Sequence, residues 1–141
     1  MDDSVDKLIK QLKKHEGVEL KPYKCTSNKL TIGIGRNLED VGISENEAEY
    51  LLMNDLDTYM TAAKTYDWYN GLNDARKAVI VNMLFNMGQT NFNKFLKMKQ
   101  ALDVGDHAEA AKQMLDSRWA KQVKGRSEEL AAQMETGKWQ P

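Results

Sequence analysis

Apolar residues recur at helical spacing near the start of the chain. Four of them follow the i, i+3, i+4, i+7 pattern of an amphipathic helix: Val5, Leu8, Ile9 and Leu12. Asp3 and Ser4 are both suited to cap its start, and Gly17 is suited to end it. We therefore expect a helix over residues 4–16, with Glu16 as its last residue.

The pattern changes over residues 18–38. After a polar TSNK segment, apolar and β-branched residues are interspersed with glycine: Leu30, Thr31, Ile32 and Ile34. This predicts a small antiparallel sheet with a turn near residues 27–29, too small to be stable by itself.

Helical patterns resume after residue 43. Ser44 and Glu47 match a capping box, and four apolar residues form the stripe of a helix over residues 44–63: Ala48, Leu51, Leu52 and Leu56. Residues 73–88 begin with Asn73, which is suited to cap a helix, and end with Gly88, which is suited to terminate one. They are apolar nearly all round between Ala78 and Phe85, which predicts a buried central helix. The run at 79–81 also fits a strand, but the length and the caps favour a helix.

Four shorter helices complete the expected secondary structure. We place them at residues 90–103, 106–115, 117–123 and 126–135, punctuated by Gly105, Gly125 and Gly137. The length of 141 residues fits one compact domain, and the composition, with 41% apolar and 29% charged residues, argues against disorder. The lone Cys25 excludes an internal disulfide.

The chain shows no targeting or membrane segment by its pattern. Its start, MDDSVDKLIKQLKK, lacks the apolar core of a secretory signal, and there is no run of eighteen apolar residues. We therefore expect synthesis to end in the cytoplasm, without stable membrane association.

Charge is unevenly distributed although the net charge is only −1. The segment from Lys13 to Arg36 contains six basic residues and two acidic ones. Residues 37–63 contain no basic residue, and the segment from Arg118 to Arg126 contains four basic residues and no acidic one. If the two basic segments meet in space, they form a positive cleft for an anionic polymer. From charge alone, a solvated charged face is the favoured interpretation.

Several kinds of chemistry are excluded by pattern. His15 and His107 lie far apart in sequence and Cys25 has no second thiol at ligand spacing, so no metal site is predicted. The GIG at 33–35 lacks the spacing and the strand–loop–helix setting of a nucleotide-binding loop. No G-x-S-x-G motif is present. We expect no metal and no cofactor.

Glu16 is the best candidate for acid chemistry. At about 100 degrees per residue, it returns to within about 20 degrees of Val5 on the apolar stripe. It also lies at the helix C-terminus, where the dipole opposes a negative charge. Burial and dipole would both favour the protonated form that a glycosidic oxygen needs. The alternative is a side chain that extends to solvent or pairs with a cation.

The segment HEGVELKPYKCTSNKLTIGIGR resembles the catalytic segment of the phage-type, T4 lysozyme-like endolysins. That family's pattern is Glu, eight residues, Asp or Cys, five residues, Thr, and it falls on Glu16, Cys25 and Thr31. Similarity continues through ISENEAEYLLMNDL, DARKAVIVNMLFNMGQTNF and SRWAKQVKGR to TGKW, so it covers nearly the whole chain.

The resemblance implies an α+β, mostly α fold. It implies one lysozyme-like domain, with an N-terminal helix and β lobe over 1–43, a linking helix over 44–63 and a helical lobe over 64–141. Peptidoglycan would lie in the cleft between the lobes. The implied enzyme is a muramidase that cleaves the β-1,4 bond between N-acetylmuramic acid and N-acetylglucosamine.

The resemblance also implies roles for individual residues. Glu16 would be the general acid, Thr31 would help to place the attacking water, and Arg126 and Asn86 would contact the substrate. Arg126 would also be able to pair with Glu16, which would favour its ionised form. Trp119 and Trp139 are expected to be packing groups rather than sugar platforms.

Cys25 departs from the usual carboxylate that activates water in an inverting glycosidase. A free thiol with a pKa of about 8.5 is only a few per cent thiolate near pH 7, unless Lys24 or Lys29 lowers that pKa. One hypothesis is that Cys25 and Thr31 mainly hold the water. A second is that Cys25 attacks the sugar and forms a covalent intermediate.

Other functions remain open at this point. A lytic transglycosylase needs one acid/base Glu and no water-activating partner, which fits the missing Asp. A catalytically silent glycan-binding module and a small helical regulator that touches nucleic acid are alternatives from other classes. The family implies a monomer that acts on bacterial peptidoglycan, does not bind nucleic acid, accumulates in the host cytoplasm and reaches the periplasm and cell wall when a holin opens the membrane.

Overall fold

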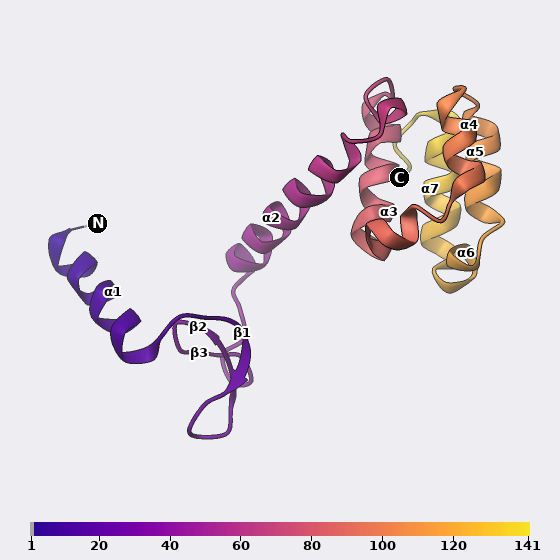
Figure 1. Ribbon diagram of the computed structural model, residues 1–141. Helices are drawn as coiled ribbons and strands as arrows, with labels where there is room; N and C mark the ends of the chain where they lie inside the picture. Colours follow the sequence, from indigo (N-terminus) through magenta and orange to yellow (C-terminus); the bar gives the residue numbers. More distant parts are fainter. Residues whose placement is uncertain (1) are drawn as a thin grey trace. The chain divides into compact units, whose positions relative to one another are not determined.

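The computed structural model describes residues 2–141, which divide into two compact units at the Tyr50–Leu51 bond. Over these residues the chain forms seven α-helices, one 3-10 helix and three short strands (Figure 1). This confirms the prediction of an α+β, mostly α fold. Unit 1 is residues 2–50 and contains the sheet, and unit 2 is residues 51–141 and is entirely helical.

Helix α1 (Asp3–Glu16) opens unit 1 and ends at Gly17, as predicted. The cap differs from the prediction, because the Asp2 carboxylate accepts a hydrogen bond of 3.0 Å from the backbone N–H of Val5. The pattern predicted that the apolar stripe of α1 would be buried. This prediction was wrong, because no residue of α1 is buried.

The sheet of unit 1 has three antiparallel strands in the order β1-β2-β3. They are β1 (Glu19–Lys24), β2 (Leu30–Gly33) and β3 (Arg36–Asn37). Residues 25–29 connect β1 to β2, which confirms the predicted turn. Strand β1 carries Pro22 and lies at the edge, where a missing N–H is tolerated.

Helix α2 (Glu45–Ala63) begins in unit 1 and continues into unit 2. Its predicted capping box is confirmed: Ser44 Oγ accepts from the backbone N–H of Glu47 at 3.1 Å, and Glu47 Oε1 accepts from that of Ser44 at 2.9 Å. The predicted apolar stripe is covered only at its end. Leu56 packs against the core, whereas Leu51 and Leu52 are exposed.

Helix α3 (Asp74–Phe92) forms the centre of unit 2 and resolves the helix or strand alternative at 79–81 in favour of a helix. Asn73 caps it as predicted, accepting from the backbone N–H of Arg76 at 2.9 Å. The helix is interrupted at Gly88, as predicted, because this residue has a non-helical φ of 80° and ψ of 163°. A second helical segment follows the kink and reaches Phe92.

The remaining helices follow the predicted order with shifted boundaries. They are η1 (Asp67–Tyr69), α4 (Leu96–Asp103), α5 (His107–Leu115), α6 (Arg118–Gln122) and α7 (Lys124–Thr136). The helix predicted at residues 90–103 is divided, because the segment after Gly88 ends at Phe92 and α4 begins only at Leu96. The prediction that Gly125 separates two helices was wrong, because it lies inside α7. Gly137 caps α7 in the left-handed conformation.

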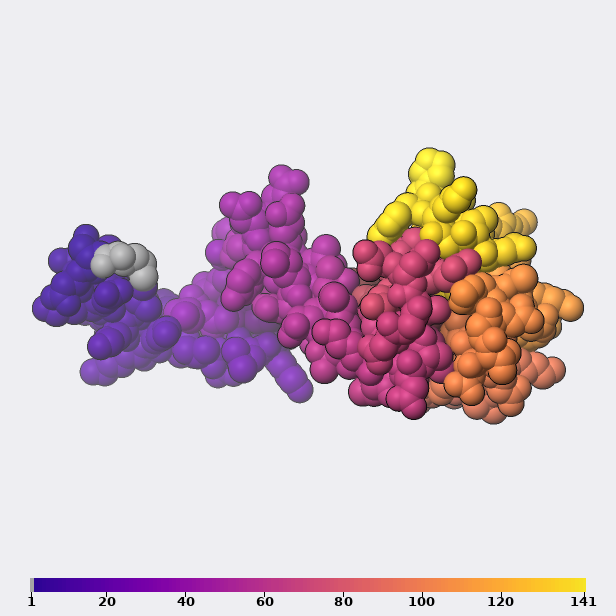
Figure 2. Space-filling view, turned by 90° about the horizontal axis from the view of Figure 1, so that it is seen from above, coloured from indigo at the N-terminus to yellow at the C-terminus, as the bar shows by residue number. Residues whose placement is uncertain are grey.

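The hydrophobic core lies in unit 2. Helices α3 and α7 lie side by side (Figures 1 and 2), joined where Arg76 donates to the carbonyl of Met134 at 2.7 Å and Gln133 donates to that of Ala75 at 2.7 Å. Four methionines are fully buried, as expected for gap-filling side chains: Met83, Met98, Met114 and Met134. Met53 and Met60 are exposed, so that expectation holds only in part.

Candidate active site

Cys25 and Thr31 meet at the neck of the β1–β2 hairpin. The pairing of Lys24 with Leu30 places the two residues just beyond and just inside the last strand pair. The Cys25 backbone N–H donates to the carbonyl of Lys29 at 3.0 Å, and the Asn28 N–H donates to the carbonyl of Cys25 at 2.8 Å. Asn28 has a φ of 58°, a left-handed conformation that asparagine tolerates in turns. The loop is therefore closed by its own backbone.

This loop lowers the pKa of the half-buried Cys25 thiol. The largest cause is hydrogen bonding from the backbone of Lys29, followed by the backbone of Ser27 and the hydroxyl of Thr31, while partial burial opposes them. The charges of Lys24 and Lys29, which were open alternatives from the sequence, are not among the causes of the lowered pKa. Peptide N–H groups and a hydroxyl stabilise the thiolate instead.

Thr31 is buried, with 3% of its surface exposed. Its hydroxyl donates to the carbonyl of Lys29 at 2.8 Å and also lies close enough to Cys25 to lower the thiol pKa. The single hydroxyl proton can be donated either to the carbonyl of Lys29 or to the Cys25 sulfur. The two lone pairs of the hydroxyl oxygen remain able to accept a hydrogen bond. The structure therefore places the Thr31 hydroxyl within hydrogen-bonding reach of the Cys25 sulfur.

Glu16 lies against Gly35. A β-carbon at position 35 would come within 2.8 Å of Glu16 Oε2 and 3.1 Å of its Cδ, so any other residue there would displace the carboxyl group from this position. The Glu16 side chain is exposed. This corrects the expectation that burial of the apolar stripe would screen its carboxyl group and keep it protonated. The alternative, a side chain that extends to solvent, is the observed one.

The two lysines beside the loop are neutralised by acids from the segment after β3. Lys24 Nζ lies 3.0 Å from Glu39 Oε1, and Lys29 Nζ lies 3.5 Å from Asp40 Oδ1. Glu39 Oε1 also accepts a hydrogen bond of 2.8 Å from the backbone N–H of Leu30. Glu39 was not recognisable as part of the site from the sequence, because no spacing rule joins it to Lys24 or Leu30.

Asn86 and Trp119 form a polar contact in unit 2. The indole N–H of Trp119 donates to Asn86 Oδ1 at 2.7 Å. Trp119 is buried, as predicted for a packing group, whereas Trp139 is 66% exposed and the same prediction was wrong for it. Asn86 itself is exposed, so its amide NH₂ group is accessible to a ligand.

Arg126 is held against α3 by Asn82. Its Nε and Nη2 donate to Asn82 Oδ1 at 2.9 and 2.6 Å. Both residues line a mainly apolar groove of about 520 Å³ in unit 2, which Phe85 also borders. The contact fixes the guanidinium group by two of its donors and leaves the remaining N–H groups free to bind an anion or a hydroxyl.

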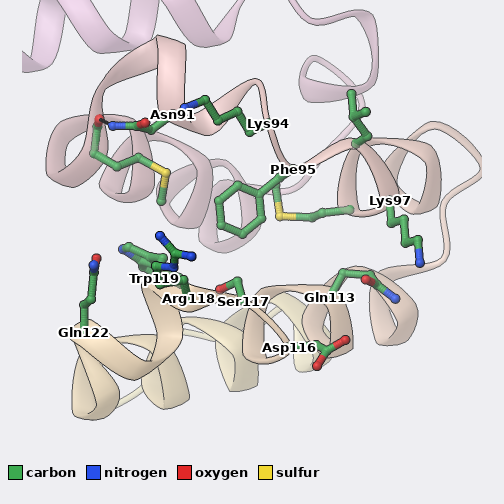
Figure 3. Close-up of a pocket in the computed structure, with 13 residues that line it drawn as sticks. Asn91, Lys94, Phe95, Lys97, Gln113, Asp116, Ser117, Arg118, Trp119 and Gln122 are labelled. Atoms are coloured by element: carbon green, nitrogen blue, oxygen red, sulfur yellow. Dashed lines mark hydrogen bonds between the residues drawn. The ribbon is translucent and has the colours of Figure 1, made fainter.

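A second groove in unit 2, of about 720 Å³, carries more positive than negative charge. Figure 3 shows Phe95 facing Arg118, Ser117 and Trp119 across it. Two further cations and one acid line this groove: Lys94, Lys97 and Asp116. Arg118 belongs to the basic segment seen in the sequence, whereas Lys94 and Lys97 were not singled out there.

The predicted site residues are distributed over both units. Cys25, Thr31 and Glu16 belong to unit 1, and Asn86 and Arg126 belong to unit 2. His107 starts α5, in keeping with a helix-end residue. Over residues 2–141, no group of three His, Cys, Asp or Glu side chains is arranged to hold a metal ion. No helix in that range is long and apolar enough to cross a membrane.

Comparison with known proteins gives a consistent result. The sequence profile of the family described as phage lysozyme matches residues 13–135. Two proteins of Dictyostelium discoideum named probable T4-type lysozyme 1 and 2 are 31% and 29% identical, each over 94% of this chain and 96% of its own length. An endolysin of Acyrthosiphon pisum secondary endosymbiont phage 1 is 31% identical over 78% of this chain and 75% of its own.

Proposed function

Because this chain belongs to the phage lysozyme family and is a lysozyme-like peptidoglycan hydrolase, we propose that it cleaves the β-1,4 bond between N-acetylmuramic acid and N-acetylglucosamine. Glu16 is the general acid that protonates the glycosidic oxygen. The observation that carries the proposal is the joint placement of Cys25 and Thr31 on a self-closed hairpin loop, at the family's spacing from Glu16.

Glu16 is suited to proton transfer by its position. It ends α1, and its carboxyl group lies against Gly35, the last residue of the turn before β3. The side chain is exposed, so a bound saccharide strand has access to it. A glycan over this carboxyl group would exclude bulk water from it, so that the proton passes directly to the glycosidic oxygen.

Cys25 and Thr31 hold the attacking water. The loop N–H groups and the Thr31 hydroxyl stabilise negative charge on the sulfur, so the thiolate accepts a hydrogen bond from water more readily than a free thiol. Thr31 has a lone pair free to accept a second hydrogen bond. Together they orient water for attack on the anomeric carbon, with base strength as a secondary contribution.

Asn86 and Arg126 contribute contacts to the glycan from unit 2. Asn86 keeps its NH₂ group accessible while its oxygen is bound by Trp119. Arg126 is fixed in direction by Asn82. Side chains that are already ordered lose less entropy when they bind a ligand, which supports a role in substrate binding.

The test of Glu16 is lysis of outer-membrane-permeabilised bacteria, followed by turbidity. Glu16→Gln keeps the shape but cannot donate the proton, and we expect it to lower the rate by roughly 100-fold or more. Glu19→Gln removes a nearby exposed carboxylate at the start of β1 and should retain most of the activity. Full activity of Glu16→Gln would rule out the proposed mechanism.

The test of Cys25 is replacement by Asp and by Ser. If the residue holds water, Cys25→Asp retains substantial lysis, and a complete loss would contradict the proposal. A nucleophilic Cys25 would instead form a covalent glycosyl intermediate and retain the anomeric configuration. NMR of the newly released reducing end distinguishes the two, because direct attack by water inverts that configuration.

A second candidate reaction is lytic transglycosylation, favoured by the absence of a carboxylate at position 25. In that reaction the 6-hydroxyl of muramic acid attacks instead of water. Mass spectrometry of digested cell wall separates the two reactions, because 1,6-anhydro ends mark transglycosylation and reducing ends mark hydrolysis.

We propose that the protein accumulates as a monomer in the cytoplasm of an infected cell and reaches the wall when a holin opens the inner membrane. The endolysin among its relatives supports this setting. Fractionation of infected cells before and after holin triggering tests it, and release of the protein without holin would contradict it.

A further inference from the structure

Strand β3 ends too early to pair fully with β2. Its pairing with β2 stops at Thr31 and Asn37. The next pair would join Leu30 and Leu38 by two hydrogen bonds. The first is present, because the Leu38 N–H donates to the carbonyl of Leu30 at 2.8 Å. The second, from the Leu30 N–H to the carbonyl of Leu38, is absent, and that carbonyl accepts from the N–H of Gly42 at 3.1 Å instead. The N–H of Leu30 therefore needs another acceptor.

Glu39 supplies that acceptor. Its Oε1 accepts from the N–H of Leu30 at 2.8 Å and from Lys24 Nζ at 3.0 Å. Both contacts lower the pKa of the Glu39 carboxyl group, the bond from Leu30 more than that from Lys24, so the group is charged at neutral pH. One carboxylate oxygen thus joins the end of β1 to the start of β2.

The two residues bound by Glu39 directly precede the two proposed water-holding residues. Lys24 is followed by Cys25, and Leu30 is followed by Thr31. Lys24 and Leu30 are also the last pair of the hairpin before the loop. We propose that Glu39 is a positioning residue that fixes the separation of the Cys25 sulfur and the Thr31 hydroxyl by clamping the neck of this hairpin. This inference rests on the proposed function.

The clamp matters because a hairpin of this size is weakly held. Two-stranded hairpins are marginal in water, and β3 contributes only two residues to the sheet. Cys25 follows β1 and Thr31 lies in β2, so opening of the neck would move the sulfur away from the hydroxyl. Misplacement of a catalytic group by about 1 Å can cost about 100-fold in rate.

Asp40 offers a matched control. It is the next residue, it carries the same charge and it pairs with a lysine of the same loop, Lys29, at 3.5 Å. It differs in that its side chain contacts no backbone group of β1 or β2, and its other polar contacts are with Asn37. Loss of a charge beside the loop is therefore separable from loss of the clamp.

The experiment compares Glu39→Ala, Glu39→Gln and Asp40→Asn on solubilised glycan strands. We expect Glu39→Ala to lower kcat by roughly tenfold with little change in KM, because the water is misplaced but the glycan still binds. Glu39→Gln should restore most of kcat, since its amide oxygen still accepts from Leu30. Asp40→Asn should behave as the parent protein.

Alkylation of Cys25 by iodoacetamide as a function of pH gives a second readout. Opening of the neck weakens the hydrogen bonds to the sulfur, so Glu39→Ala should shift the alkylation midpoint to higher pH, and Glu39→Gln should shift it less. A parental kcat and midpoint in folded Glu39→Ala would overturn the inference. So would equal losses in Glu39→Ala and Asp40→Asn. If Glu39→Ala does not fold, Glu39→Asp replaces it with the same expected outcomes.

Failure of the proposed function gives a different result. Glu16→Gln would then lyse cells like the parent, whereas the alkylation midpoint does not depend on turnover. A shifted midpoint in Glu39→Ala without any loss in Glu16→Gln would leave the clamp in place and remove its catalytic role. A normal midpoint together with an inactive Glu16→Gln would refute the clamp alone.

Discussion

The carboxyl group of Glu16 occupies the space that a β-carbon on Gly35 would need, although the two residues lie far apart in sequence within unit 1. Gly35 also has a φ of 70°, which side chains with a β-carbon rarely adopt. Glycine at position 35 therefore has two roles: it permits the positive φ of the turn, and it leaves space for the carboxyl group of the proposed acid.

Gly35→Ala should lose more activity than Gly33→Ala. Both glycines have a positive φ, of 70° and 71°, so both variants should lose about 1–2 kcal/mol of stability. Position 33 has no neighbour within 4 Å of an added β-carbon, whereas position 35 would push Glu16 aside. Thermal unfolding measures the shared loss, and cell lysis measures the difference. Equal activities would contradict a role for the contact.

Thr31→Val should raise the pKa of Cys25. The hydroxyl of Thr31 is one of the groups that lower this pKa, and valine removes it at similar volume. The pH at which alkylation of the thiol is half-maximal should therefore increase. Thr26→Val changes an exposed threonine of the same loop and serves as the control. An unchanged midpoint in Thr31→Val would show that the peptide N–H groups alone stabilise the thiolate.

Glu47→Gln should destabilise the protein where Glu47 is ionised in the folded state, and not at lower pH. Hydrogen bonds from Arg36 and from the backbone of Ser44 lower the pKa of Glu47 from 4.5 to about 2. Since the folded-state pKa is depressed, the stabilisation is present above the unfolded pKa and is lost as the pH falls through the folded pKa. The difference in Tm from the parent should be largest above pH 4.5 and disappear near pH 2.

Glu45→Gln provides the control for that pH series. Glu45 lies in the same first turn of α2 but makes none of the contacts that Glu47 makes with Arg36 and Ser44. Its Tm difference from the parent should be small at every pH. A Glu47→Gln difference that persists at pH 2 would show that the contacts do not depend on the charge.

Asn86→Leu should destabilise unit 2 by about 1–2 kcal/mol, because the buried indole N–H of Trp119 loses its acceptor. Urea unfolding followed by tryptophan fluorescence measures the loss. In a Trp119→Phe background the same change should cost little, since phenylalanine has no N–H to satisfy. A full cost in that background would show that Asn86 stabilises the unit by other contacts.

Local features of this fold were predictable from the sequence. The helix that ends at Gly17, the Ser44–Glu47 capping box and the Asn73 cap all depend on residues within a few positions of one another. Caps and turns are stabilised by bonds within one turn of chain, so their signals are local. The break at Gly88 was predicted correctly, and the boundary error at Gly125 also has a local origin, because glycine is permitted but not required to end a helix.

The candidate site could be predicted only in part from the sequence. The spacing of Glu16, Cys25 and Thr31 identified the candidate residues, and the side-chain composition excluded a disulfide. Tertiary structure decided their environments, because these depend on residues brought near by folding: Gly35 beside Glu16, Glu39 across the hairpin neck, and Asn86 beneath Trp119. It also decided that Glu16 is exposed, since an apolar stripe on a helix shows which face is able to pack but not what covers it.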